Sequence, residues 1–314
     1  MPGVTDKALA ACREALDRLC GENDGPVLAA VSGGPDSMAL LHLLALARPM
    51  GLGAATVDHQ LRPESADEAR AVARFCAAHD IPHAILTPEQ PITGNVQSSA
   101  RAARYKLLHR HADLGGYRWI ATAHHADDQL ETMLMRLARG AGLDGMAGIR
   151  AINGRIIRPL LDLRKADLLA VCAEAGLPFA SDPSNANSDF DRVKMRTALA
   201  GFDNVPPAMA ARSALALGEA GEALNWIVTR EAAGHIQQSG AALVLDVQDW
   251  PREILRRLVL HCLLQVDPGC TPRGESLDRA LAALKNGEKA MLGDVLITPG
   301  ARWTFAMAPP RRAG

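Results

Sequence analysis

Three groups of polar residues along the chain have types and spacing that suit a ligand-binding site, and the first group suits phosphate. The first is the hexapeptide SGGPDS, which follows the apolar run VLAAV and precedes a second apolar run with helical spacing. Its two glycines let the backbone turn sharply, so that successive N–H groups can face an anion beside the positive end of a helix. The hexapeptide predicts a phosphate-binding loop formed by Ser32, Gly33, Gly34, Pro35, Asp36 and Ser37.

This loop contains an aspartate and no lysine. It lacks the Gly-Lys-Ser/Thr ending of a Walker A loop and the G-x-G-x-x-G spacing of a dinucleotide turn. A bare carboxylate would repel phosphate, so Asp36 makes chemical sense if Mg²⁺ bridges it to phosphate oxygens. The alternative is a strand-to-helix turn in which Ser32 or Asp36 caps the helix without any metal.

The other two groups are the pair Asp58 and His59 and the segment HHADDQLET, residues 124–132. If a helix begins near Ala126, then His124, Asp128 and Glu131 are spaced by four and three residues and share one face. The alternatives are an ordinary turn at DHQLRP and a polar helix face with internal charge pairing.

Strands that alternate with helices would place the three groups at one edge of a sheet. Apolar runs predict strands, and longer periodic segments predict helices between them, which together indicate an α/β domain with a doubly wound parallel sheet. Ligands of such sheets bind at the carboxyl ends of the strands, where each polar group falls. The predicted strands are 27–31, 53–58, 83–87 and 118–124, and the helices are 36–48, 64–79, 95–114 and 126–139.

The remainder of the chain predicts a second domain. After Leu143 the chain is rich in Gly and Arg, a helix is expected over 165–175, and the double proline in FDNVPPAM indicates a linker. We therefore expect one α/β domain over 1–204 and a smaller, mainly helical domain over 205–314. The elements expected in the second domain are helices at 207–234, 251–265 and 275–285, a strand at 242–247 and a final pair of strands.

Composition excludes several classes of protein. The 314 residues are 48% hydrophobic and 22% charged, with a net charge of −1, which describes a globular domain rather than a basic coat for nucleic acid. The N-terminal stretch carries charges throughout, and no apolar window reaches the roughly 18 residues that span a bilayer. We expect a cytoplasmic protein with no membrane partner. None of the six cysteines forms a C-x-x-C pair, so a zinc or iron–sulfur site is not predicted.

A local excess of positive charge suits contact with phosphates. Between Arg101 and Lys165 there are twelve Lys or Arg against six Asp or Glu, an excess of six. The alternative is a solvated basic face. Because aromatic residues are only 4% of the chain, phosphate and shape contacts should dominate over base stacking. The arginines around the glycine-rich segment are Arg136, Arg139, Arg150, Arg155, Arg158 and Arg164.

The loop SGGPDS resembles the signature of the PP-loop ATP pyrophosphatase superfamily, whose domain is adenine nucleotide alpha-hydrolase-like. Several further blocks, in the expected order over residues 24–200, are similar to those of the tRNA(Ile)-lysidine synthetase family. These blocks are VDHQLRPESADEA, SARAARYKLL, ATAHHADDQLETMLMRLARGAGLDGMAGI, RPLLDLRK and DPSN.

This resemblance implies an ATP-dependent ligase with an ATP-binding catalytic domain over 1–204 and a tRNA-binding domain over 205–314. Family members adenylate the wobble cytidine in the CAU anticodon of tRNA(Ile), and free L-lysine then displaces AMP to give lysidine, so that AUA is read instead of AUG. For this chain the resemblance implies ATP and Mg²⁺ held by the loop, with Asp36 on the metal and Asp58 and His59 toward the nucleotide. It implies catalytic roles for Asp36, Arg104, His124, Asp128 and Glu131, where Asp128 and Glu131 would grip the ammonium of lysine.

The chain departs from the family pattern at one position and leaves other readings open. Val193 stands where an asparagine is expected, although Arg192 and Arg196 are retained. A cytidine thiolase would want paired cysteines, a small-molecule amide ligase would leave the basic segment without a use, and a non-catalytic nucleotide-binding module would not use the His-Asp-Glu face. The residues do not decide which histidine is catalytic, whether the protein forms a homodimer, or how methionine tRNA is excluded.

Overall fold

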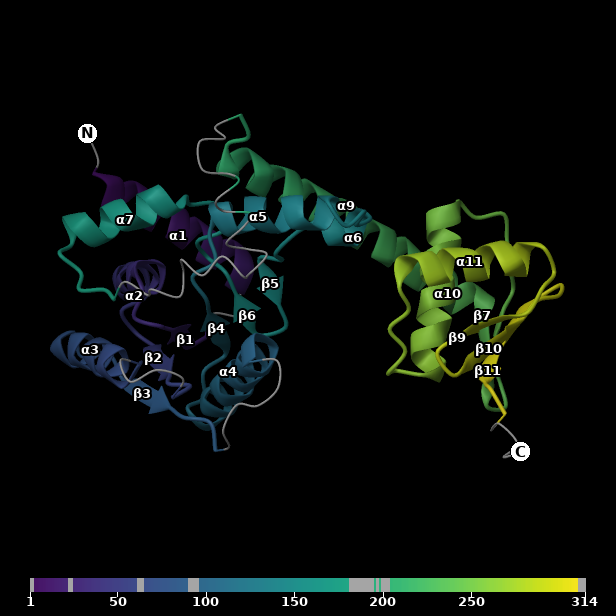
Figure 1. The fold of residues 1–314 in the computed structure, drawn as a ribbon, viewed down its shortest axis with the longest axis horizontal. Helices are drawn as coiled ribbons and strands as arrows, with labels where there is room; N and C mark the ends of the chain where they lie inside the picture. Colours follow the sequence, from purple (N-terminus) through teal and green to yellow (C-terminus); the bar gives the residue numbers. More distant parts are fainter. Residues whose placement is uncertain are drawn as a thin grey trace. The chain divides into compact units, whose positions relative to one another are not determined.

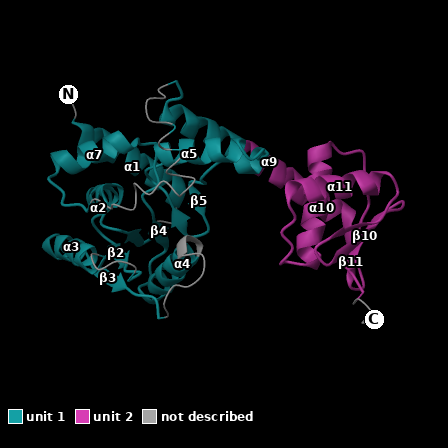
Figure 2. Ribbon diagram, in the orientation of Figure 1, with its two compact units in different colours: residues 1–218 teal, residues 219–314 magenta. Residues whose placement is uncertain are grey.

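A computed structural model describes residues 3–21, 25–60, 65–89, 96–180, 195, 198 and 204–309 (Figure 1). The chain separates into two compact units, Met1–Gly218 and Glu219–Gly314 (Figure 2). This division falls within helix α9 (Pro207–His235), a little later than the limit after residue 204 that the double proline suggested. Each unit has a sheet and a core of its own.

The first unit contains a six-stranded sheet in the order β3-β2-β1-β4-β6-β5. All neighbouring strands run parallel except β5 and β6, which form an antiparallel pair. The strand order reverses between β1 and β4, and ligands of doubly wound sheets bind at such a reversal. The strands are β1 (Val27–Ala30), β2 (Leu52–Val57), β3 (His83–Leu86), β4 (Trp119–Ala121), β5 (Ile152–Asn153) and β6 (Ile156–Ile157).

Helices cover both faces of this sheet, because successive side chains of a buried strand point to opposite sides. Val27 and Ala29 of β1 join the larger core with α1, α2, α3 and α7, whereas Leu28 joins a smaller core with α4. The predicted doubly wound α/β fold is therefore confirmed. The helices are α1 (Val4–Cys20), α2 (Pro35–Ala47), α3 (Ser65–Ala78), α4 (Val96–Leu114), α5 (Ala126–Leu137), α6 (Leu143–Met146) and α7 (Lys165–Glu174).

The second unit is smaller and combines helices with a five-stranded antiparallel sheet in the order β7-β8-β11-β10-β9. Helices α10 and α11 contribute Leu258 and Leu281 to a core that encloses Phe305 of β11. The sheet has five strands, whereas the sequence predicted three in a mainly helical unit. Strands β7 and β9 were not predicted, because their sequences IQQS and AML show no extended apolar alternation. The new elements are β7 (Ile236–Ser239), β8 (Ala242–Leu245), α10 (Arg252–Val266), α11 (Gly274–Lys285), β9 (Ala290–Leu292), β10 (Val295–Thr298) and β11 (Trp303–Met307).

All six cysteines are free thiols and buried. Burial raises the pKa of Cys12 and of Cys262 to about 12, so these thiols stay protonated at neutral pH. Within the described residues, no helix has the length and apolar character needed to cross a membrane.

Candidate active site

The SGGPDS loop connects β1 to α2, and the Ser37 hydroxyl stabilises it through two hydrogen bonds within the loop. The Ser37 hydroxyl donates to the Gly34 carbonyl at 2.9 Å and accepts from the Ser32 backbone N–H at 3.1 Å. Gly33 has φ of +88°, a conformation that side chains disfavour, which explains the need for glycine at this turn. Because α2 begins at Pro35, its positive dipole end faces the loop, as an anion site requires.

Beside the loop lies a cavity of about 280 Å³, which is lined by residues of β1, α2, β2, α4 and α5 and of the segment that follows β4. It brings together six residues that the sequence predicted, from three separate segments. The polar residues that line it are Ser32, Asp36, Ser37, Arg101, Arg104, Tyr105, Thr122, His124 and Asp128. Arg101, Tyr105 and Thr122 were not predicted. The Thr122 hydroxyl lies 3.0 Å from Nδ1 of His124 and so fixes the orientation of that ring.

Asp58, His59 and Glu131 do not line this cavity. The Asp58 carboxylate accepts hydrogen bonds from the Gln60 backbone at 2.8 Å and the Ser65 hydroxyl at 2.7 Å, so it takes part in a local turn. Contact of Asp58 and His59 with a nucleotide stays a prediction. Both ring nitrogens of His59 are buried without a hydrogen-bond partner among the described residues. Glu131 is only 4% exposed, because the face of α5 that carries it turns into the protein.

Three carboxylates surround the buried ring of His125. Its Nε2 lies 3.6 Å from Asp36 and 3.5 Å from Asp128, and its Nδ1 lies 3.5 Å from Asp127. Burial alone would lower the pKa of His125, but the three carboxylates outweigh burial and raise it to about 9. The imidazolium is therefore a fixed positive charge at neutral pH. Burial acts to raise the pKa of Asp36, yet His125 and Lys165 lower it below its usual value.

The lysine that the loop lacks comes from a distant part of the chain. Lys165, at the start of α7, places its Nζ 3.5 Å from Oδ2 of Asp36. Its backbone N–H donates to Asp127 at 2.8 Å, which ties the start of α7 to the start of α5. In the sequence Lys165 is only the last residue of the block RPLLDLRK and had no predicted role, since no local spacing links it to Asp36.

Two of the arginines expected to suit phosphate contact donate hydrogen bonds to the backbone of the glycine-rich segment. Arg136 donates to the carbonyls of Gly145 at 2.5 Å and Gly148 at 2.8 Å. Arg158 is 6% exposed and donates to the Arg150 carbonyl. Arg192, Val193 and Arg196 lie outside the described residues.

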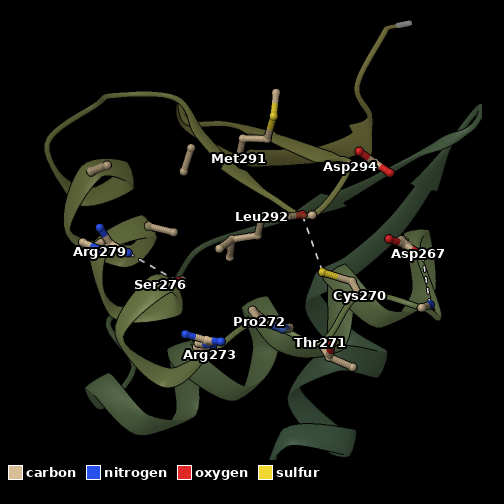
Figure 3. Close-up of a pocket in the computed structure, with 15 residues that line it drawn as sticks. Asp267, Cys270, Thr271, Pro272, Arg273, Ser276, Arg279, Met291, Leu292 and Asp294 are labelled. Carbon is tan, nitrogen blue, oxygen red and sulfur yellow. Dashed lines mark hydrogen bonds between the residues drawn. The ribbon is translucent and has the colours of Figure 1, made fainter. Parts of the chain in front are cut away.

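The second unit has a separate open hollow of about 950 Å³ beside the start of α11 and the turn between β9 and β10. Figure 3 shows Arg273 and Arg279 on one side of this hollow and Asp267 and Asp294 on the other. Arg273 and Arg279 are both exposed, so their guanidinium groups can meet an anionic partner.

Residues 8–201 match the PP-loop domain family. The chain is 42% identical to a tRNA(Ile)-lysidine synthase of Zymomonas mobilis subsp. mobilis over 292 residues, which cover 90% of this chain and 88% of the relative. It is 40% identical to a tRNA(Ile)-lysidine synthase of Novosphingobium aromaticivorans, over 97% of this chain and 95% of that one. Among solved structures, the U34-tRNA thiolase NcsA from Methanococcus maripaludis shares the fold, with a TM-score of 0.56 and 18% identity over 68% of this chain and 80% of that chain.

Proposed function

Because the chain belongs to the family of tRNA(Ile)-lysidine synthases, whose catalytic unit is a PP-loop ATPase, we propose that it joins free L-lysine to the wobble cytidine of tRNA(Ile) through an adenylated intermediate. One observation supports the site most directly. A phosphate loop, two arginines, a histidine and two carboxylates share a single cavity at the point where the strand order reverses.

In the first step we assign the cavity to ATP and the cytidine base. The position-2 carbonyl oxygen of cytidine forms a bond to the α-phosphorus, the bond from that phosphorus to its bridging oxygen breaks, and pyrophosphate leaves with the electron pair. Backbone N–H groups of the loop hold the phosphates, and Arg101 and Arg104 offset the charge that develops on them.

In the second step the side-chain amine of lysine attacks carbon 2 and AMP leaves. A lysine amine has an ordinary pKa near 10.4, so it must lose a proton before it can attack. We assign Asp128 to hold the ammonium and His124 to accept its proton, and the position of both residues in the cavity lining supports this assignment. The role expected for Glu131, as the second carboxylate for lysine, requires access to the cavity that its buried side chain does not have in this conformation.

The residues present also fit a bound Mg²⁺ ion. Oδ1 of Asp36 is buried and has no hydrogen-bond partner among the described residues. Buried polar atoms normally have a partner, so this oxygen is available to bind a metal ion. Across the part of the chain that the structure describes, no group of three or more acidic, histidine or cysteine side chains could hold a metal by itself. Mg²⁺ often takes one carboxylate, with phosphates and water completing its shell, and it would offset phosphate charge when bound.

The second unit is the candidate tRNA-binding unit. Its exposed Arg273 and Arg279 form a basic side to the hollow of Figure 3, on a unit that carries no part of the ATP cavity. Arginine pairs of this kind suit contact with the phosphate backbone of RNA.

Thiolation, the activity of the U34-tRNA thiolase that shares this fold, is disfavoured by the thiols of this chain. All six cysteines are buried, and burial raises the pKa of each, whereas sulfur transfer needs accessible thiolates or a cluster.

The test incubates the protein with ATP, labelled lysine and tRNA(Ile) bearing CAU, beside the same tRNA with UAU as the control. We expect label in the CAU transcript, with AMP and pyrophosphate formed in equal amounts, and no label in the UAU transcript. Absence of label from both transcripts would overturn the proposed function.

A further inference from the structure

Lys165 places an ammonium group beside a phosphate loop that contains no lysine of its own. Its Nζ lies 3.5 Å from Oδ2 of Asp36, and its side chain is 39% exposed, so it faces both the loop and solvent. A lysine within a phosphate loop normally contacts the β- and γ-phosphates of a nucleotide. Here the same chemical group arrives from the first residue of α7.

The backbone at the start of α7 is held in place by contacts with α5 and with the loop. Its backbone N–H donates to Asp127 at 2.8 Å, while the Cys172 thiol, two turns along α7, donates to the Pro35 carbonyl at 3.3 Å. Leu168 and Val171 of α7 are fully buried in the core that α2 also enters. The start of α7 is therefore held against the loop by packing that does not involve the Lys165 side chain.

The two cations paired with Asp36 differ in what they can do. His125 is 3% exposed and surrounded by Asp36, Asp127 and Asp128, so its charge is already shared among three carboxylates. Lys165 pairs with a single carboxylate within the described residues, and it has a flexible four-carbon stem and three donors. It is the cation that can turn from Asp36 to an incoming phosphate.

We propose that Lys165 is a catalytic residue that binds the β- and γ-phosphate groups of ATP and stabilises pyrophosphate as it leaves. The inference rests on the proposed function and deepens its first step. As the bond from the α-phosphorus to the bridging oxygen breaks, that oxygen gains negative charge, and the Lys165 ammonium, which lies beside Asp36 of the loop, offsets that charge. Asp36 holds the ammonium near the loop until the nucleotide arrives.

The experiment compares the wild-type protein with Lys165→Gln and Lys165→Arg, measuring the affinities for ATP and for AMP by calorimetry without tRNA. For Lys165→Gln we expect ATP affinity to fall about 10- to 100-fold, the range for loss of a charge-assisted hydrogen bond. AMP affinity should change less than about twofold, because AMP has no β- or γ-phosphate, and Lys165→Arg should restore part of the ATP affinity. Pyrophosphate release with tRNA should fall at least as far as ATP affinity.

Lys7→Gln is the matched control, since Lys7 is an exposed lysine on α1 of the same unit. It should leave both affinities unchanged. Equal losses of ATP and AMP affinity in Lys165→Gln, or no loss of either, would overturn the inference. A further outcome is that the wild type makes no lysidine while Lys165→Gln still lowers the affinity for ATP more than that for AMP. In that case the proposed function fails and the phosphate role of Lys165 stands. If lysidine forms and Lys165→Gln binds ATP normally, only the inference fails.

Discussion

Asp36 is the residue on which the proposed chemistry depends most, because it touches the loop, the cavity and both neighbouring cations. One of its carboxylate oxygens pairs with His125 and Lys165, while the other is buried with no partner in the described part of the chain. Replacing the carboxylate with an amide preserves its shape and removes the charge that a metal ion needs.

We therefore expect Asp36→Asn to lower the rate of pyrophosphate release by about 100- to 1,000-fold, the usual effect of removing one electrostatic interaction with a transition state. Measurement of pyrophosphate release at several Mg²⁺ concentrations checks this, with Asp67→Asn, at an exposed position on α3, as the control. Near wild-type release by Asp36→Asn, in a protein with an unchanged circular dichroism spectrum, would contradict the assignment of metal to Asp36.

His125 should make stability depend on pH in the metal-free protein. Its pKa is about 9 when folded and near 6.5 in the unfolded chain, so its stabilising effect is complete below about pH 6.5 and disappears as pH rises through 9. We expect wild type to exceed His125→Gln in free energy of unfolding by on the order of 2–3 kcal/mol at pH 6. Urea titrations between pH 6 and 10 should show that difference shrinking, and a constant difference would mean that His125 is neutral.

At the scale of elements, the orientation of helix α5 determines which of its carboxylates lines the cavity. Asp128 lines the cavity, whereas Glu131, one turn later, is 4% exposed. The sequence spacing correctly placed them on neighbouring positions of a helix, but spacing does not say where a helix begins to turn into the core.

Glu131→Gln tests whether the buried Glu131 carboxylate serves the second step of the reaction. If Glu131 supports lysine as the family resemblance implies, pyrophosphate release should stay within about twofold of wild type while lysine incorporation falls about 100-fold or more. Rapid-quench measurement of both products in one reaction checks this. Equal losses in both would move Glu131 to the first step, and no loss in either would give it a role in packing alone.

Much of the fold of the first unit could be predicted from the sequence. Its apolar runs alternate with longer segments of helical periodicity, and this pattern indicates four strands, each followed by a helix. The two-residue strands β5 and β6 could not, because they are too short to show a period. The loop was predictable from adjacent residues, as were Arg104, His124 and Asp128 from their motifs. The contacts of Lys165 with Asp36 and Asp127 were not, because only the packing of α7 against α2 and α5 brings these segments together.

At the scale of the whole molecule, each unit has its own core and its own hollow. This organisation lets binding of tRNA be weakened without change in the ATP cavity. We expect Arg273→Ala with Arg279→Ala to lower tRNA affinity and to reduce the slope of log K against log salt by about one for each phosphate that an arginine no longer neutralises. ATP affinity should not change.

Filter binding at several salt concentrations checks this, with Arg252→Ala as the control because the Arg252 guanidinium is engaged by Asp278 at 2.7 Å. A double variant with wild-type tRNA affinity and slope would show that the hollow of Figure 3 does not meet the tRNA backbone.

Because all six native thiols are buried, a single cysteine introduced at the surface of the folded protein can be labelled selectively. A cysteine introduced at Met291, which is 56% exposed at the edge of the hollow in the second unit, would be the one thiol open to a maleimide dye. Its fluorescence would report occupancy of that unit in real time, with the native cysteines left in place.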